Sequence, residues 1–205
     1  MKSIIKIQSL VLAVLCGAAL VSCNPKSEHA DEHAGHDHGD DVTTKTAEAA
    51  SAPLFKVSAD FQKQLSEVFT HYVSMKDAFV SSDAGKVKEE SKKVTAALNS
   101  VDMKLVDGAA HHDWMTYLDP MQKSLQTIQS SDDISTQRKE FSTVSDNLYK
   151  SIKAFGLGGT NAFYEYCPMA FNNQGGYWLS DKDEIRNPYF GDEMLTCGVV
   201  QEKLN

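Results

Sequence analysis

Residues 61–79 read FQKQLSEVFTHYVSMKDAF, and the large apolar side chains in this segment return at alternating steps of four and three. That period places them along one face of an α-helix, with polar side chains on the remaining surface. The apolar positions are Phe61, Leu65, Val68, Tyr72, Met75 and Phe79. Ser58 is a suitable N-cap, and Ser81-Ser82-Asp83 both ends this helix and offers a cap to the next. Such a short turn favours an antiparallel neighbouring helix.

Three further amphipathic patterns follow. Apolar side chains recur at helical spacing over residues 87–101, 114–128 and 134–155, and the first of these patterns is the weakest. Pro120 lies inside the second pattern, where proline is expected to kink or break the helix. Four amphipathic helices with short connections predict a mainly α protein, with an antiparallel four-helix bundle over residues 55–157.

Beyond the fourth helix the sequence changes to short aromatic runs. FYEYC at 163–167 and YWL at 177–179 flank the turn-forming segment NNQGG at 172–176, which predicts a β-hairpin. Residues 194–200 are expected to return as a further strand or an extended segment. Because a single hairpin is marginally stable in water, residues 158–205 are expected to form a small β-hairpin and irregular subdomain packed on the bundle, as one domain with it.

The first 22 residues predict a lipoprotein signal peptide. Two lysines precede an apolar run, Leu10 to Val21, which is short for a membrane span. The run ends in Leu20-Val21-Ser22-Cys23, similar to the lipobox at which bacterial lipoproteins are cleaved and acylated. Cys23 is therefore the predicted lipidation site, and we expect an envelope protein held by lipid, in the outer membrane facing the periplasm or the surface. Residues 23–54 contain almost no large apolar side chain and predict a disordered tether rich in His and Asp.

Composition and motifs argue against several function classes. The net charge of −8 leaves no basic face for neutralising phosphates, so nucleic acids are not expected partners. The sequence contains no Gly-x-Ser-x-Gly, His-Glu-x-x-His, Cys-x-x-Cys or phosphate-binding glycine loop. We therefore expect that the protein is not an enzyme.

Two short clusters each combine a thiol with a thioether: Cys167-Pro168-Met169 and Met194-Leu195-Thr196-Cys197. Sulfur ligands select soft metals such as Cu(I) or Ag(I), so four sulfur atoms could form a site if the two segments meet in space. The alternative is a structural Cys167–Cys197 disulfide with both methionines filling the core, since disulfides persist in exported proteins. Two buried free thiols are the third possibility.

These clusters also carry a family resemblance. The segments YCPMA at 166–170, GYWLS at 176–180, IRNPYFG at 185–191 and MLTCG at 194–198 resemble the C-terminal signature of a family of uncharacterised exported domains. That family occurs alone or appended to periplasmic adaptor subunits of copper and silver efflux systems. The resemblance covers about residues 58–204. It implies a heavy-metal efflux context more firmly than a particular set of ligands.

The helical half carries part of the same resemblance, which matches His112, Trp114-Met115, Arg138, Phe141 and Ser145. His111 lies four residues before Met115, so both fall on one helical face, and His111 or His112 could complete a sulfur-rich site. For either histidine the alternative is a capping or solvated side chain.

The tether holds a second constellation of possible ligands. His29, His33, His36 and His38 alternate with acidic side chains, and such tracts bind divalent ions such as Cu(II), Zn(II) or Ni(II). A solvated spacer is the alternative interpretation. Taken together, the expected function is an envelope lipoprotein that binds copper or silver ions and buffers them or passes them to efflux components. The rival hypothesis is a structural or interaction lipoprotein stapled by a Cys167–Cys197 disulfide.

Overall fold

The computed structural model describes residues 52–205, so the predicted signal peptide and tether, with Cys23, His29, His33, His36 and His38, lie outside the described residues. Residues 52–205 belong to one compact unit. In chain order its elements are α1 (Ala59–Val80), α2 (Ala84–Asn99), η1 (Met103–Leu105), α3 (Gly108–Ser130), α4 (Ile134–Phe155), β1 (Ala162–Cys167), α5 (Ala170–Asn173), β2 (Gly176–Ser180), η2 (Gly191–Glu193) and β3 (Val199–Leu204).

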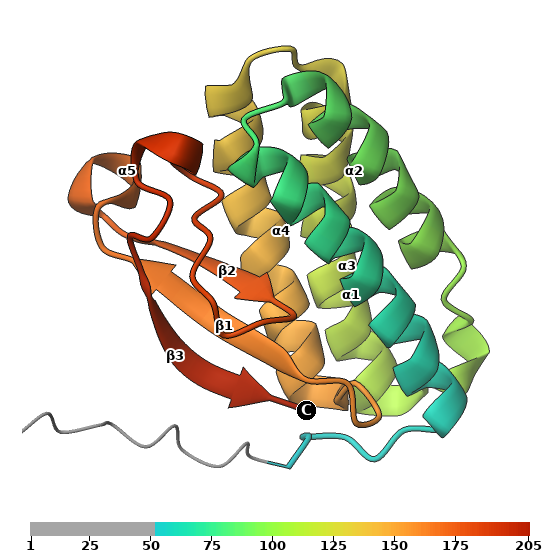
Figure 1. Cartoon of the computed structure of the whole chain (residues 1–205). Helices are drawn as coiled ribbons and strands as arrows, with labels where there is room; N and C mark the ends of the chain where they lie inside the picture. Colours follow the sequence, from blue (N-terminus) through green and yellow to red (C-terminus); the bar gives the residue numbers. More distant parts are fainter. Residues whose placement is uncertain (1–51) are drawn as a thin grey trace, which may run out of the picture. The chain divides into compact units, whose positions relative to one another are not determined.

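The four long helices form the predicted bundle, in which α1 packs on α2, α2 on α3 and α3 on α4 (Figure 1). The expected caps are present: the Ser58 side chain accepts from the N–H of Phe61 at 3.2 Å, and Asp83 accepts from the N–H of Lys86 at 2.9 Å. All six apolar positions predicted for the first helix are fully buried. The mainly α fold class is therefore confirmed.

Pro120 does not interrupt its helix, so the expected break is wrong. α3 runs continuously from Gly108 to Ser130 through the proline. Leu118 and Met121, on either side of Pro120, are both buried in the core. Packing of α3 against α2 and α4 outweighs the backbone hydrogen bond that the proline lacks, so the helix continues through Pro120.

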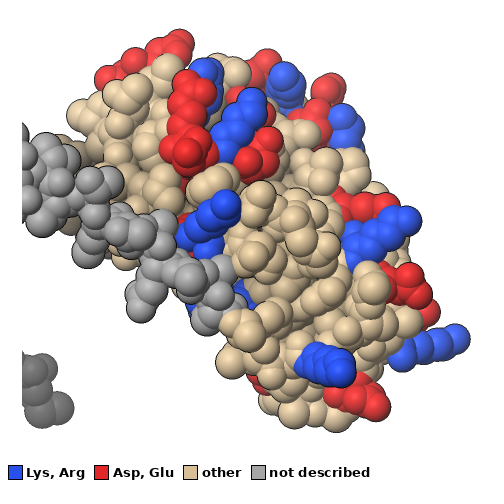
Figure 2. Space-filling view, turned by 60° about the horizontal axis from the view of Figure 1, so that its bottom comes forward, with Lys and Arg blue, Asp and Glu red and all other residues tan. Residues whose placement is uncertain are grey.

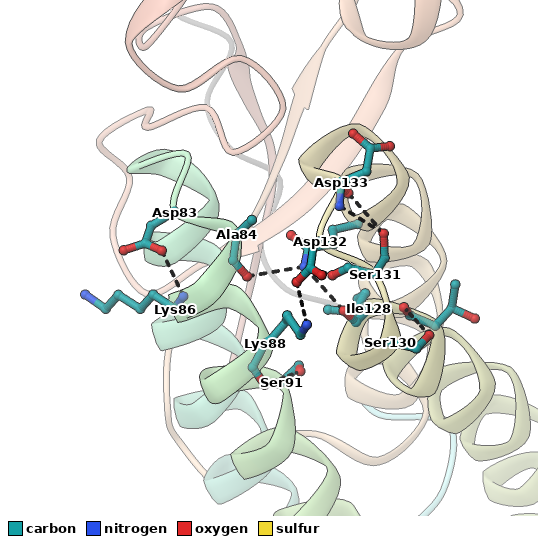
Figure 3. Close-up of polar contacts among 12 residues, drawn as sticks. Asp83, Ala84, Lys86, Lys88, Ser91, Ile128, Ser130, Ser131, Asp132 and Asp133 are labelled. Carbon is teal, nitrogen blue, oxygen red and sulfur yellow. Dashed lines mark hydrogen bonds and ion pairs between the residues drawn. The ribbon is translucent and has the colours of Figure 1, made fainter.

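Polar contacts join the helices at one end of the bundle, where α2 begins and α3 turns into α4 (Figure 3). Lys88 of α2 forms an ion pair with Asp132 at 2.6 Å. The buried side chain of Gln137 donates to three carbonyl groups, the nearest being that of Ser131 at 2.8 Å. These contacts fix the α3–α4 turn against the start of α2.

At the other end of the bundle, the segment just before α1 packs on the end of α4. The N–H of Phe55 donates to the carbonyl of Ala154 at 2.8 Å, and its ring stacks on Phe155 with a centroid distance of 5.5 Å. Phe61 and Trp114 also contact Phe155, with centroid distances of 5.1 and 6.1 Å. The first residues of α1 and α3 therefore meet the last residues of α4 here.

The C-terminal segment forms a three-stranded antiparallel sheet in the order β2-β1-β3. The β1–β2 hairpin confirms the sequence prediction, and β3 adds the third strand. Tyr166 lies opposite Tyr177 of β2 and opposite Val199 of β3, which fixes the register. Figure 1 shows the sheet beside the bundle, with β2 nearest to the helices.

Charged side chains are mixed over the surface. On the face shown in Figure 2, acidic and basic residues lie side by side and form no continuous basic area. That face therefore offers no extended surface for binding phosphates. Among residues 52–205, no helix is both long enough and apolar enough to cross a membrane.

Candidate functional site

The face of the sheet that carries Cys167 is covered by the segment 181–198. Side chains alternate along a strand, so Glu165 and Cys167 share one face of β1, and Trp178 of β2 lies opposite Glu165. The ring of Trp178 contacts Tyr189 with a centroid distance of 5.9 Å. Gly198 approaches so closely that an added Cβ would lie 2.8 Å from the Trp178 ring and 3.1 Å from the carbonyl of Tyr166. Cys167 is fully buried as a result.

Asn187 fastens this covering segment. Its side chain is fully buried, and its Nδ2 donates to the carbonyl of Cys197 at 2.7 Å. Its Oδ1 accepts from the N–H of Tyr189, and its own N–H donates to the carbonyl of Leu195, both at 2.8 Å. The Asn187 side chain therefore joins the backbone at Tyr189 to the backbone at Cys197, and so fixes the position of Cys197.

Cys167 and Cys197 are free thiols that lie close together, because Tyr166 pairs with Val199 and an added Cβ on Gly198 would lie 3.1 Å from the carbonyl of Tyr166. The pKa of Cys197 is raised to about 11, first by burial and then by the neighbouring Cys167 thiol, whereas the N–H of Met169 acts to lower it. Cys197 is half-buried while Cys167 is fully buried. The structure thus brings together the two thiols that the sequence singled out.

Met169 and Met194 flank Cys197 through the backbone. The N–H of Met169 donates to the Cys197 sulfur, and the carbonyl of Met194 accepts from the N–H of Cys197 at 3.0 Å. Both side chains are exposed, Met169 by 45% and Met194 by 40%. The alternative that these methionines fill the core is therefore wrong, because neither is buried.

Glu165 is a feature of this region that the sequence analysis missed. It is fully buried, and both carboxylate oxygens lack a hydrogen-bond partner in the described residues, as does Nε1 of Trp178. The pKa of Glu165 is raised to about 8, mainly by burial, and the Lys76 ammonium limits the rise. The only sequence signal was a single acidic residue inside the aromatic run FYEYC.

A cleft of about 290 Å³ lies between α1 and the segment that follows β2. Its lining includes the nearly buried Lys76, the buried Ser180 and the exposed side chains of Asp181, Lys182 and Arg186. Acidic and basic groups are mixed in this lining, so the cleft favours neither cations nor anions.

The histidines of α3 lie away from the cysteines. Trp114, one turn after His111, contacts Phe155 at the C-terminal end of α4. His112 is exposed, and His111 and Met115 are half-buried at the same end of α3. At this end of the bundle α1 and α3 begin and α4 ends, and Phe55, just before α1, packs on Phe155 of α4.

Cys167 lies near the opposite end of α4. It pairs with Gly176, and an added Cβ on Gly176 would lie 2.7 Å from the ring of Tyr189. Tyr189 contacts Phe141, whose centroid is 5.9 Å away. Phe141 and Phe155 are separated by about 21 Å along α4. His111, His112 and Met115 therefore cannot complete a site with the cysteines, and that part of the expected ligand set is corrected.

The described residues restrict which ligands a metal could have. Within residues 52–205, no three side chains of His, Cys, Asp or Glu lie close enough together to hold a metal ion. Two thiols with neighbouring thioethers suit a soft ion that accepts low coordination, and they do not suit Ca²⁺, Mg²⁺ or a four-coordinate structural Zn²⁺.

Comparison with known proteins finds one family. Residues 68–160 match the family described as protein of unknown function (DUF3347), a range that begins in α1 and ends just before β1. The match thus covers the helical half of the described unit and stops short of Cys167 and Cys197. No curated protein and no solved structure matches the sequence. Residues 68–160 are therefore similar to DUF3347, an uncharacterised domain family.

Proposed function

We propose that this protein binds soft heavy-metal ions, Cu(I) or Ag(I), through Cys167 and Cys197. One observation carries the proposal: two free thiols, separated by 30 residues of sequence, lie close together where the end of the segment 181–198 meets β1. Thiolates prefer soft monovalent ions, and two of them suffice for such an ion. The exposed Met169 and Met194 supply thioethers next to the half-buried Cys197.

Binding by thiolates couples metal uptake to proton release. The thiols must lose their protons to become ligands, and the raised pKa of Cys197 means that protons compete with the metal at neutral pH. The backbone N–H of Met169 would stabilise the negative charge that remains on the Cys197 sulfur. Tight binding at neutral pH therefore requires an ion with a strong preference for sulfur.

The sequence suggests the cellular setting of this function. Cys23 would carry the lipid that anchors the chain in the envelope, and His29, His33, His36 and His38 would gather divalent ions nearby. The resemblance of the C-terminal motifs to domains associated with copper and silver efflux favours buffering of these ions or their transfer to efflux components. A lipoprotein whose cysteines form a permanent structural disulfide remains the rival hypothesis.

Competition for Cu(I) tests the proposal. Full-length reduced protein in detergent, kept without oxygen, is expected to withdraw Cu(I) from a chromogenic chelator. Cys167→Ser and Cys197→Ser should each lose this competition, and the double variant Met169→Leu and Met194→Leu should bind about tenfold more weakly. Met121→Leu, in the buried core, and His111→Ala, at the far end of α3, are the controls. Uptake that persists without both cysteines would overturn the proposal.

A further inference from the structure

We infer that Cys167 and Cys197 also form a reversible dithiol and disulfide couple, which exchanges with small-molecule disulfides through Cys197. This chemistry uses the same sulfur atoms as the proposed metal site but does not depend on metal binding. It differs from the rival hypothesis of a permanent staple, because the bond would form and break while the protein remains folded.

The two thiols lie close together at one end of the β1–β3 ladder. Cys167 ends β1 and is held in the ladder opposite Gly176. Cys197 lies outside the strands, in the turn closed by its own N–H and the carbonyl of Met194. One sulfur is therefore fixed by the sheet, while the other belongs to a turn that can adjust to the geometry of a disulfide. Because Tyr166 pairs with Val199 and Gly198 lies against the Tyr166 carbonyl, the two cysteines are neighbours at this end of the β1–β3 ladder.

The two thiols differ in access, and this assigns their roles. Cys167 has no exposed surface, whereas Cys197 is half-buried and borders the exposed side chains of Met169 and Met194. An external disulfide can reach only Cys197. The N–H of Met169 stabilises the charge of the attacking thiolate, but the pKa of Cys197 is about 11, so only a small fraction of Cys197 is thiolate at neutral pH and the exchange is slow there. Cys197 is thus the attacking residue and Cys167 the resolving residue.

The exchange proceeds in two displacement steps. The Cys197 thiolate, having released its proton to solvent, attacks one sulfur of a small disulfide R–S–S–R. A mixed disulfide forms, and one R–S⁻ leaves and takes up a proton. The Cys167 sulfur, after losing its proton, then attacks the Cys197 sulfur and displaces the second R–S⁻, which is protonated in turn. Two protein thiols are oxidised by two electrons, and R–S–S–R is reduced to two R–SH.

The oxidised form has a consequence for the proposed metal site. Both thiolates are consumed by the disulfide, so the same pair cannot hold a soft ion at the same time. Metal loading should therefore protect the pair from exchange, and oxidation should abolish loading. This consequence, unlike the exchange itself, rests on the proposed function.

Oxidised glutathione is a suitable probe. Full-length protein in detergent is incubated with mixtures of oxidised and reduced glutathione, trapped with acid, digested and analysed by mass spectrometry, which locates each modified cysteine. The wild type should acquire a Cys167–Cys197 cross-link that excess reduced glutathione removes. Cys167→Ser should accumulate glutathione on Cys197. Cys197→Ser should acquire glutathione on Cys167 at least about tenfold more slowly, because Cys167 is buried.

Unfolded protein provides the control for access. In concentrated urea the two single-cysteine variants should react at the same rate, so that the difference between them belongs to the folded protein. The inference is overturned if the wild type keeps both thiols across the whole range of mixtures, if its cross-link resists reduced glutathione, or if the folded variants react equally fast. Exchange in the wild type that added Ag(I) does not slow would contradict the proposed function and leave the couple intact.

Discussion

The hydroxyl of Tyr72 accepts a hydrogen bond from the backbone N–H of Leu179 at 3.1 Å, and this bond joins α1 to the edge strand β2. The same hydroxyl is hydrogen-bonded to Oγ of Ser145 in α4 at 2.7 Å. Burial raises the pKa of Tyr72, so the group is neutral at all ordinary pH values. A single buried oxygen therefore connects two helices of the bundle with the sheet that carries the cysteines.

Tyr72→Phe should weaken the attachment of the sheet. The substitution leaves the Leu179 N–H buried without its partner, which costs about 1–3 kcal/mol of the free energy of unfolding. Unfolding in urea, followed by circular dichroism, measures the loss. Tyr177→Phe is the matched control, because Tyr177 is 38% exposed. Equal stability of Tyr72→Phe and wild type would show that this bond contributes nothing.

Glu165→Gln should remove a pH dependence of stability. The pKa of Glu165 is about 8 in the folded protein, above its ordinary value of 4.5. Between these values the folded state keeps a proton that the unfolded chain releases, so stability should fall as pH rises from about 4.5 to about 8 and then level off. The loss should be on the order of 4–5 kcal/mol in the wild type and absent in the variant.

Urea unfolding at several pH values across this interval checks the prediction for Glu165. Glu184→Gln, an exposed carboxylate on the covering segment, should keep the slope of the wild type. The slope is the relevant readout, since a buried glutamine amide also needs hydrogen-bond partners. If the free energy of unfolding of Glu165→Gln falls with pH as steeply as that of the wild type, a group other than Glu165 takes up the proton in the folded protein.

Gly198→Ala should push the covering segment away from the sheet. The added Cβ would lie 2.8 Å from the Trp178 ring and 3.1 Å from the carbonyl of Tyr166, and the φ of +152° disfavours a side chain. We expect a loss of about 1–3 kcal/mol in stability and slower formation of the Cys167–Cys197 cross-link. Gly159→Ala is the control, because Gly159 also has a positive φ but has nothing within 4 Å of an added Cβ. Equal effects of both substitutions would mean that backbone strain alone is responsible.

Asn187→Ala should release Cys197. Its buried side chain makes hydrogen bonds to the carbonyl of Cys197 and the N–H of Tyr189, and losing them should cost about 2–3 kcal/mol. Cys197 should then react several-fold faster with an alkylating reagent, while Cys167 remains protected in β1. Quantitative mass spectrometry measures both rates. Asn161→Ala, at an exposed position, should leave them unchanged, and an unaltered Cys197 rate in Asn187→Ala would refute the role of Asn187.

Local patterns were sufficient to predict the helices. The 3.6-residue period and the side-chain caps depend only on neighbouring residues, so Ser58 and Asp83 could be recognised in the sequence. The hairpin was predictable for the same reason, from aromatic runs on either side of a glycine turn. The break expected at Pro120 does not occur, because packing on both sides of the proline overrides its local preference.

The site depended on contacts that sequence spacing does not reveal. Cys197 comes to lie near Cys167 because Asn187 and Gly198 hold the segment 181–198 on the sheet. Conversely, the four-residue spacing of His111 and Met115 says nothing about which end of the bundle faces the sheet. Glu165 could not be predicted as buried and unpartnered, since most glutamates in such runs are solvated.

The contact of Phe55 with Phe155 gives the molecule a direction. The entering chain is fastened at the end of α4 that lies about 21 Å from the level of Phe141, where the aromatic side chains next to the cysteines pack. An attachment of the chain before Phe55 would therefore approach the protein from this end of α4. The half-buried Cys197 lies away from that end, beside the exposed side chains of Met169 and Met194.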